Sequence, residues 1–406
     1  MEREQLFKRF LIYFTAFLVC VDVYALQRGF GIILGPLADL LQMKRSAMFL
    51  IPVMYSLGYG VAGTFTSIIV DKYPRKSLII GALVYCVCLL SCALFITHYY
   101  VLLTFYFFMS MGSYVLGTGV WGYLMRTKGF GTTWDCISPG VARTVGPLIL
   151  TALATFFLQF GVDKVLFALC GTVIISASLF YIVTRSVEVK PNTNKSGGVL
   201  GGIKKGLILL KDKGFRKFVG MLTMNYATLM LIGANAIFIL RDYGLSKNEA
   251  MWYFSLFFLI CGVSGRFIWA AIGYYVSNRF SMITSILLLS IGMVLLTINL
   301  NCAYIGLILL GMGTAGAGVN HSPYIGDRWG QENLFTYLGN AFTIATIVSA
   351  ILIYLTGQVY EITKSYSIGF RLYAILPVLA SVYFFFEKNI NYVNQLNGRG
   401  RKQFYG

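Results

Sequence analysis

Three arginines, Arg28, Arg143 and Arg266, lie in apolar stretches long enough to cross a membrane, and Asp22 is the only acidic residue in such a stretch. A cation inside hydrocarbon costs roughly 2.5–3.5 kcal/mol on insertion scales, so it persists where it faces water or a partner. One carboxylate cannot neutralise three guanidiniums. The surplus positive charge predicts binding of an anion, and a guanidinium matches a carboxylate with two parallel hydrogen bonds.

Arg28 follows Tyr24 by four residues, which places both on one face of a helix. We therefore expect a guanidinium and a phenol that contact the same carboxylate. Asp22 lies six positions before Arg28 and falls on another face, so a direct pair within the helix is not expected. The alternatives are that Arg28 extends outward to the membrane surface or pairs with Asp22 through tertiary packing.

Arg266 lies near the middle of its apolar stretch, beside Gly262 and Gly265, which let another helix or a ligand approach closely. This position in mid-span, with small residues beside it, predicts that Arg266 contacts a substrate. Arg143 lies only two turns into its stretch and can extend toward the cytoplasmic surface. Its predicted role is packing or gating.

Four further polar residues lie in apolar stretches. His321 can titrate near neutral pH, and it joins Asp22 as a candidate for proton coupling, with a structural role as the alternative. Asn225, Tyr226 and Tyr114 are weaker candidates for contacts with a substrate.

The elements that must position these residues are membrane-spanning helices. The 406-residue chain is 57% hydrophobic and 12% charged, whereas a soluble domain is about 25% charged. We expect an all-α protein with the lipid bilayer as its partner, its first span retained and not removed as a signal. The predicted spans are 9–35, 46–70, 77–97, 101–125, 137–160, 164–184, 217–240, 250–277, 280–298, 302–325, 335–356 and 368–387.

The charge distribution predicts domains and orientation. A basic linker, 185–216, separates an N-terminal half, 1–184, from a C-terminal half with its tail, 217–406. With both termini and the linker in the cytoplasm, 23 of the 33 Lys and Arg residues lie on that side and seven on the other. The net charge of +18 therefore orients helices, and no nucleic-acid partner is predicted.

The two halves also resemble each other and a known family. "PRKSLIIGALVYCVCLL" from residue 74 resembles "NRFSMITSILLLSIGMVLL" from residue 278. The loop "SIIVDKYPRKSLI" is similar to the G-x-L-x-D-R-x-G-R-R signature of the major facilitator superfamily at Asp71, Lys72, Arg75 and Lys76. The resemblance implies the major facilitator fold, twelve transmembrane helices in two pseudo-symmetric six-helix bundles. It also implies that these four residues bias one conformation.

Finer matches resemble the monocarboxylate and oxalate/formate porter branch, in "GFGIILGPL", "YGLSKNEA", "SGRFIW" and "GQVYEITKSY". This resemblance implies substrate contact at Arg28, Tyr24 and Arg266. Two departures stand out. Gly262 occupies the position of the acidic residue of the proton-coupled carriers, and the eleventh span lacks the basic residue of the oxalate/formate exchangers.

The sequence thus predicts a carrier of a small, monocarboxylate-like organic anion that works by alternating access. Proton symport, exchange with a counter-anion and facilitated diffusion all stay open. The alternatives are a carrier of another solute, such as a sugar, amino acid or drug, and a non-transporting receptor. No enzyme, cofactor or metal is predicted, because the sequence shows no phosphate-binding loop, nucleophile–base pair or metal-ligand spacing.

Overall fold

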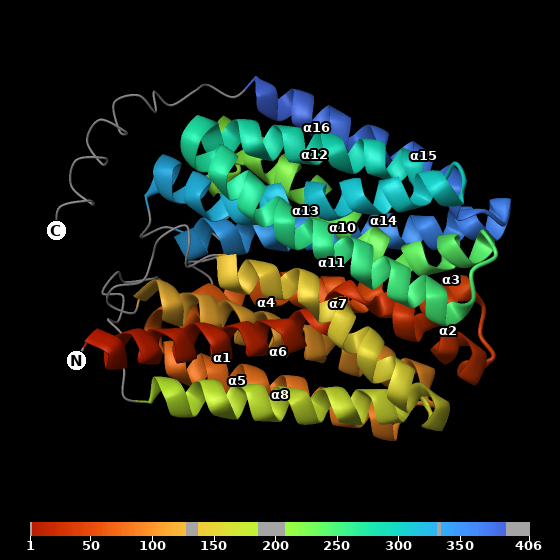
Figure 1. The fold of residues 1–406 in the computed structure, drawn as a ribbon, viewed down its shortest axis with the longest axis horizontal. Helices are drawn as coiled ribbons and strands as arrows, with labels where there is room; N and C mark the ends of the chain where they lie inside the picture. The colour runs from red at the N-terminus through yellow and green to blue at the C-terminus, as the bar shows by residue number, and fades with distance from the viewer. Residues whose placement is uncertain (1, 127–136, 186–207, 331–333, 387–406) are drawn as a thin grey trace.

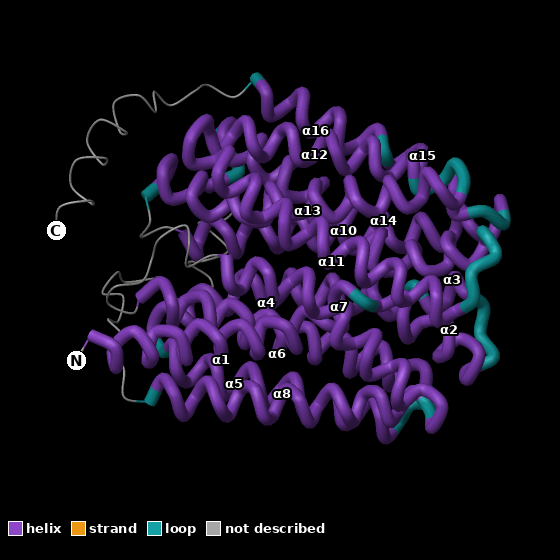
Figure 2. Tube along the Cα trace, in the orientation of Figure 1, coloured by secondary structure: helices purple, strands orange, loops and turns teal. Residues whose placement is uncertain are grey.

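The computed structural model describes residues 2–126, 137–185, 208–330 and 334–386, and within these ranges the chain is helical and contains no strand (Figures 1 and 2). The helices of the first half are α1 (Glu2–Arg28), α2 (Phe30–Leu41), α3 (Arg45–Met48), α4 (Leu50–Lys72), α5 (Pro74–Leu94), α6 (Tyr99–Arg126), α7 (Ile137–Phe157), the 3₁₀ turn η2 (Leu158–Phe160) and α8 (Val162–Thr184). Those of the second half are α10 (Lys213–Asp242), α11 (Lys247–Ile272), the π-helical turn η3 (Gly273–Ser277), α12 (Asn278–Leu295), α13 (Leu300–Trp329), α14 (Leu334–Thr363), α15 (Tyr366–Tyr373) and α16 (Ile375–Phe385).

Each half packs mainly on itself. In the first half α1 packs on α7 and α8, and α5 packs on α6; in the second, α13 packs on both α11 and α12. The largest contacts between the halves join α4 to α14 and α7 to α11. Figure 1 shows the two halves as separate layers, with α1 beginning and α16 ending toward the same end of the molecule.

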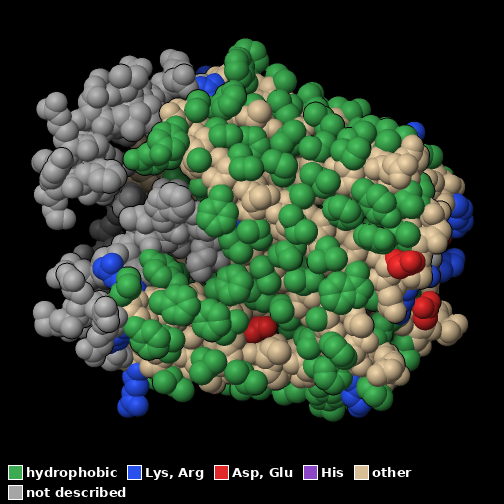
Figure 3. Space-filling model, in the orientation of Figure 1, with side chains coloured by type: hydrophobic (Ala, Val, Ile, Leu, Met, Phe, Trp, Pro, Cys, Tyr) green, Lys and Arg blue, Asp and Glu red, His purple; other side chains and the backbone are tan. Residues whose placement is uncertain are grey.

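Eleven helices in the described ranges are long and apolar enough to cross a membrane. One of them, Lys247–Leu295, comprises α11, η3 and α12 and contains two predicted spans, and the backbone becomes extended between them at Ser277, where φ is −175° and ψ is 136°. All twelve predicted spans therefore fall on helices. On the face in Figure 3, hydrophobic side chains cover the middle and most Lys and Arg side chains lie toward the two ends. These features support an integral multi-pass membrane protein.

The helix starts follow local chemistry. Pro74 opens α5, where its missing N–H costs nothing. The Asp212 carboxylate accepts the Gly214 N–H at the start of α10, with 2.8 Å between oxygen and nitrogen. Ser246 and Glu249 form a reciprocal capping box at the start of α11.

The first and twelfth spans are each interrupted, which the sequence analysis did not predict. The first breaks at Gly29, between α1 and α2, and there α10 packs so closely that a Cβ on Gly233 would lie 2.7 Å from the Arg28 carbonyl oxygen. The twelfth breaks at Ala374, between α15 and α16. Pro377 accounts for this second break, because it has no N–H for the Tyr373 carbonyl.

The predicted division of the chain stays a prediction. Most of the predicted linker, residues 186–207, lies outside the described residues, and α10 begins at Lys213, four residues before the predicted start of the second half.

Candidate functional site

Arg28 is the last residue of α1 and is only 6% exposed. Its side chain lies within electrostatic range of the Tyr24, Tyr59 and Tyr226 hydroxyls and of Arg143. Its Nε has no hydrogen-bond partner among the described residues. The interruption at Gly29 therefore ends α1 at a buried cation, where the partial negative charge of a helix C-terminus is favourable.

Arg143, from α7, lies against aromatic rings. Its guanidinium carbon is 4.8 Å from the Tyr24 ring centroid and 5.6 Å from that of Trp121, and the side chain also hydrogen-bonds Tyr24. The side chain thus contacts the residue predicted to bind substrate and does not extend to the cytoplasmic surface as the sequence suggested. Its predicted role in gating is untested by this geometry.

Arg266, from α11, is 2% exposed, and glycines from two neighbouring helices make room for its guanidinium. A Cβ added at Gly140 of α7 would lie 2.9 Å from Nη1, and one at Gly318 of α13 would lie 3.3 Å from it. Both Nε and Nη1 lack hydrogen-bond partners among the described residues. A buried donor left unsatisfied costs about 1–3 kcal/mol, more when charged, so this pocket for a guanidinium is incomplete without an acceptor.

The glycines next to Arg266 in sequence serve helix packing. A Cβ on Gly262 would lie 2.5 Å from Thr144 Cγ2 of α7, and one on Gly265 would lie 3.0 Å from the Met312 Cα of α13. Of the two predicted alternatives, close approach of a helix is the one observed at both positions.

Aromatic side chains from both halves surround the arginines. The Tyr59 ring of α4 lies 4.6 Å from the Tyr114 ring and 6.0 Å from the Tyr226 ring, between centroids. Phe342 of α14 lies 5.8 Å from Tyr226. The Gln27 amide donates to the Tyr226 hydroxyl at 2.9 Å, which links α1 to α10. We call the set the arginine–tyrosine cluster: Arg28, Arg143, Arg266, Tyr24, Tyr59, Tyr114, Tyr226, Phe342 and Gln27.

The sequence analysis missed Tyr59, Phe342 and Gln27. A partial signal exists for Tyr59, which lies between Gly58 and Gly60 in "YSLGYGVAG". Glycines in a span mark close helix contacts, and a Cβ on Gly60 would lie 2.0 Å from the Thr346 hydroxyl of α14. Phe342 and Gln27 carry no such signal.

Asp22 faces away from the cluster, toward α8. Its carboxylate accepts a hydrogen bond of 2.6 Å from the Ser176 hydroxyl and a second from Thr172. It forms no ion pair with a described arginine. The three guanidiniums therefore have no carboxylate partner within the described part of the chain.

His321 is deeply buried in α13. It is 1% exposed, eight residues before the end of α13, and its Nδ1 lies 2.9 Å from the Ala317 carbonyl oxygen. Its ring contacts Phe342 edge-on at 6.1 Å between centroids. Asn225 is buried beside Tyr226, and its Oδ1 has no partner among the described residues. The Phe342 contact places His321 at the edge of the cluster.

The four residues predicted to bias one conformation, Asp71, Lys72, Arg75 and Lys76, lie at the junction of α4 and α5. Arg75 donates to the Thr184 carbonyl at the end of α8 with 3.2 Å between nitrogen and oxygen, and Lys76 lies over the Tyr73 ring. The observed Arg75 bond stays within the first half. The side chains of Asp71 and Lys72 lie outside the described ones.

The described residues include no group of three or more His, Cys, Asp or Glu side chains that could hold a metal ion. The Asp22 carboxylate of α1 is occupied by the hydroxyl donors Ser176 and Thr172. The chemistry available in the cluster is therefore recognition of negative charge by guanidiniums and of apolar or aromatic surface by rings.

Comparison with known proteins supports the predicted fold. The sequence profile of the Major Facilitator Superfamily matches residues 218–404. No curated protein shows a significant sequence match. Among solved structures, the nucleoside transporter NupG superposes with a TM-score of 0.70 at 16% identity, covering 93% of this chain and 100% of its own.

Two structures of a POT family transporter also superpose. The complex with 5-aminolevulinic acid has a TM-score of 0.67 at 12% identity, and the complex with a thioalcohol-conjugated peptide 0.68 at 13%. Each covers 92% of this chain and 94% of its own. These identities establish a shared fold alone: the chain has the major facilitator fold, as predicted.

Proposed function

We propose that the protein is a major facilitator carrier that moves a small organic anion, resembling a monocarboxylate, across a membrane by alternating access. One observation carries the proposal: three guanidiniums converge between the halves, and none forms an ion pair with a described carboxylate. Arg28 and Arg143 come from the first half and Arg266 from the second.

A carboxylate suits the free donors. Nε and Nη1 of Arg266 have no partners in the described chain, and each forms a fork of parallel N–H groups with Nη2. A carboxylate that accepts two charge-assisted bonds from either fork satisfies one of these free donors and adds specificity for planar anions. The cost of burying this arginine is then offset only while the anion is bound.

The division of the arginines between the halves suits alternating access. An anion among them attracts both halves and favours a closed arrangement. Several contacts between the halves must break for the halves to part: the Tyr59–Tyr226 ring contact and the hydrogen bonds of Gln27 with Tyr226, Ser56 with Thr346, Thr151 with Ser255 and Thr343 with Gly60. Each is a neutral contact worth only about 1 kcal/mol, so no single one of them locks the halves together.

Proton coupling would use Asp22 or His321, whereas anion exchange and facilitated diffusion would use neither. Asp22 is held by α8 hydroxyls outside the cluster, and His321 borders it. Uptake driven by an imposed pH gradient, compared with uptake driven by a preloaded anion, separates these modes. Loss of gradient-driven uptake in Asp22→Asn or His321→Gln would identify the proton site.

The orientation is part of the same proposal. The excess of Lys and Arg in the predicted cytoplasmic segments supports cytoplasmic termini. Asp71, Lys72, Arg75 and Lys76 would then bias one conformation from the cytoplasmic end. Accessibility of tags placed at either terminus of the full chain to an impermeant reagent tests the orientation.

A second candidate is a carrier of an uncharged planar solute. The rings of Tyr59, Tyr114, Tyr226 and Phe342 favour it, because tyrosine and phenylalanine faces stack on planar ligands. A structurally similar protein is a nucleoside transporter. This candidate leaves the arginines as structural residues. A third, a receptor with this fold, would bind a ligand without moving it.

Uptake by purified protein in liposomes tests the three candidates together. The panel comprises labelled lactate, pyruvate and formate, a nucleoside, a sugar and an amino acid. We expect saturable uptake of at least one carboxylate. Uptake of uncharged solutes alone would overturn the anion proposal, and binding without uptake would favour the receptor. Arg185 is exposed at the end of α8, so Arg185→Gln is the matched control for substitutions of the cluster arginines.

A further inference from the structure

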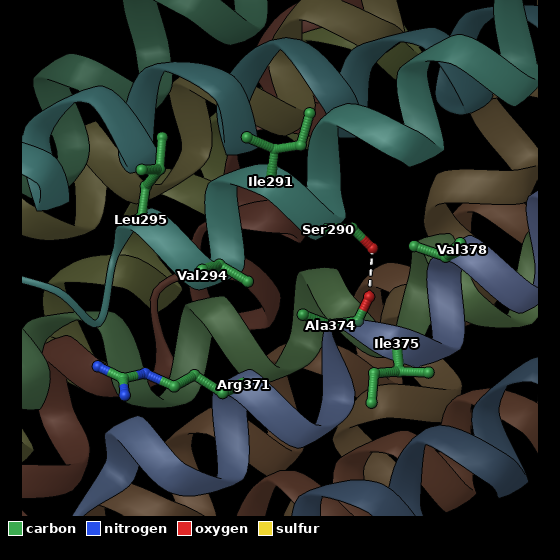
Figure 4. A pocket seen from close by; sticks show the side chains of 8 residues that line it. All are labelled: Ser290, Ile291, Val294, Leu295, Arg371, Ala374, Ile375 and Val378. Atoms are coloured by element: carbon green, nitrogen blue, oxygen red, sulfur yellow. Dashed lines mark hydrogen bonds between the residues drawn. The ribbon is translucent and has the colours of Figure 1, made fainter.

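The outer face of the second half carries an apolar groove that is remote from the arginine–tyrosine cluster. It lies between α12 and the interrupted α15–α16 pair, with about 480 Å³ of free volume (Figure 4). Its walls are the apolar side chains of Ile291, Val294, Ile375 and Val378, which are 38–55% exposed.

The break at Ala374 shapes the groove. The Ala374 carbonyl accepts a hydrogen bond from the Ser290 hydroxyl of α12, as Figure 4 shows. That bond satisfies the polar groups at the base of the groove, so the open wall is hydrocarbon. Seven residues separate Arg371 from Val378, which corresponds to roughly 10 Å along a helix.

Arg371 lies at one end of the groove. Its Nε donates to the Thr297 hydroxyl at 3.0 Å and its Nη2 to the Thr297 carbonyl at 2.8 Å. Thr297 lies in the short connection between α12 and α13, at the edge of two spans. The guanidinium is therefore held at the membrane–water interface. No described carboxylate forms an ion pair with it.

From this arrangement we propose that the groove binds an anionic phospholipid, with an acyl chain along α12 and α16 and the phosphate on Arg371. The apolar walls of the groove lie at the depth of the lipid acyl chains, and the guanidinium of Arg371 lies at the depth of the lipid phosphates. Two of its nitrogens are held by Thr297, which leaves Nη1 for the headgroup and lowers the entropic cost of binding. The proposal is independent of the transported solute.

Native mass spectrometry of the full chain in detergent, with added phosphatidylglycerol or phosphatidylcholine, tests the proposal. We expect preferential retention of phosphatidylglycerol by the wild type. Arg371→Gln should lower it about fivefold, as one basic residue near an anionic surface contributes about 1 kcal/mol. Arg371→Lys should keep most of it, and Val294→Trp, which fills the groove, should lower retention of either lipid.

Arg241→Gln is the matched control, because Arg241 is exposed in the last turn of α10, at the same end of the second half. It should retain phosphatidylglycerol like the wild type. Equal loss in Arg241→Gln and Arg371→Gln, no loss in Arg371→Gln, or equal retention of both lipids would overturn the proposal. So would dimers in the same spectra that Val294→Trp abolishes, because a second copy would then occupy the groove. Monodisperse elution of each variant shows that it is folded.

Discussion

The last two turns of helix α1 hold two buried charges in opposite states. Asp22 of α1 lies against α8 and accepts hydrogen bonds from Ser176 and Thr172. Arg28, six residues later, lies where α1 meets the second half and keeps an Nε without a partner among the described residues. Both side chains are buried to a similar degree. Burial alone therefore does not distinguish a structural charge from a binding one, but unsatisfied hydrogen-bonding capacity does.

Arg266 is the clearest case of the unsatisfied kind, and its loss should have the largest effect. In Arg266→Ala we expect anion uptake to fall about 30-fold or more, since truncating one partner of a buried charge pair costs at least about 2 kcal/mol. Thermal stability without substrate should not fall, because the variant removes an unpaired buried cation.

Initial rates in liposomes and melting temperatures of the solute-free protein check this pair of outcomes. Arg266→Lys keeps the positive charge but loses the guanidinium fork, so its anion uptake should lie between that of the wild type and that of Arg266→Ala. Unchanged uptake in Arg266→Ala, or a large loss of stability without substrate, would assign the residue to the structural class of Asp22.

Arg28→Gln should have the next largest effect, about tenfold on KM for the anion. One charged hydrogen-bond donor is lost, worth about 1.5 kcal/mol, while Gln27 and Tyr226 still join the halves. Concentration-dependent uptake measures this change. An equal fall in uptake of uncharged solutes would show that the variant disturbs the helix break and not anion recognition.

Asp22→Asn should have the opposite effect to the arginine variants: it should lower stability and largely spare uptake. Without a pH gradient we expect uptake within about threefold of wild type, but a loss of about 1 kcal/mol in stability, because a charge-assisted bond from Ser176 becomes a neutral one. Ser176→Ala is the matched variant and should destabilise to a similar degree. Thermal unfolding and uptake, measured on the same preparations of both variants, test these two expectations. Abolished uptake with unchanged stability would break the contrast with Arg28.

Tyr226→Phe should have the smallest effect, a fall in uptake of up to about fivefold, because it removes one neutral hydrogen bond to Gln27. Tyr85→Phe is its control: Tyr85 is buried and its hydroxyl has no partner among the described residues, so we expect no fall. Equal effects of the two variants on uptake would show that the Gln27 bond has no part in transport.

Sequence patterns predicted the spans and the excess of buried arginine, because both depend on residue type and run length. They did not predict the break at Gly29, which coincides with the close approach of Gly233 from the other half. They also allowed Arg143 to extend toward the cytoplasmic surface, whereas it stacks on Tyr24. The rotation of each helix about its axis is set by its neighbours, so a contact such as Tyr59 with Phe342 is absent from any local pattern.

The most direct test of the central claim compares saturable uptake of labelled pyruvate, lactate and formate by wild type and by the Arg28→Ala/Arg266→Ala double variant at equal protein density in liposomes. We expect uptake of at least one of these anions by the wild type, and uptake at the level of empty liposomes by a folded double variant. Equal uptake by both proteins, or wild-type uptake of uncharged solutes alone, would contradict it.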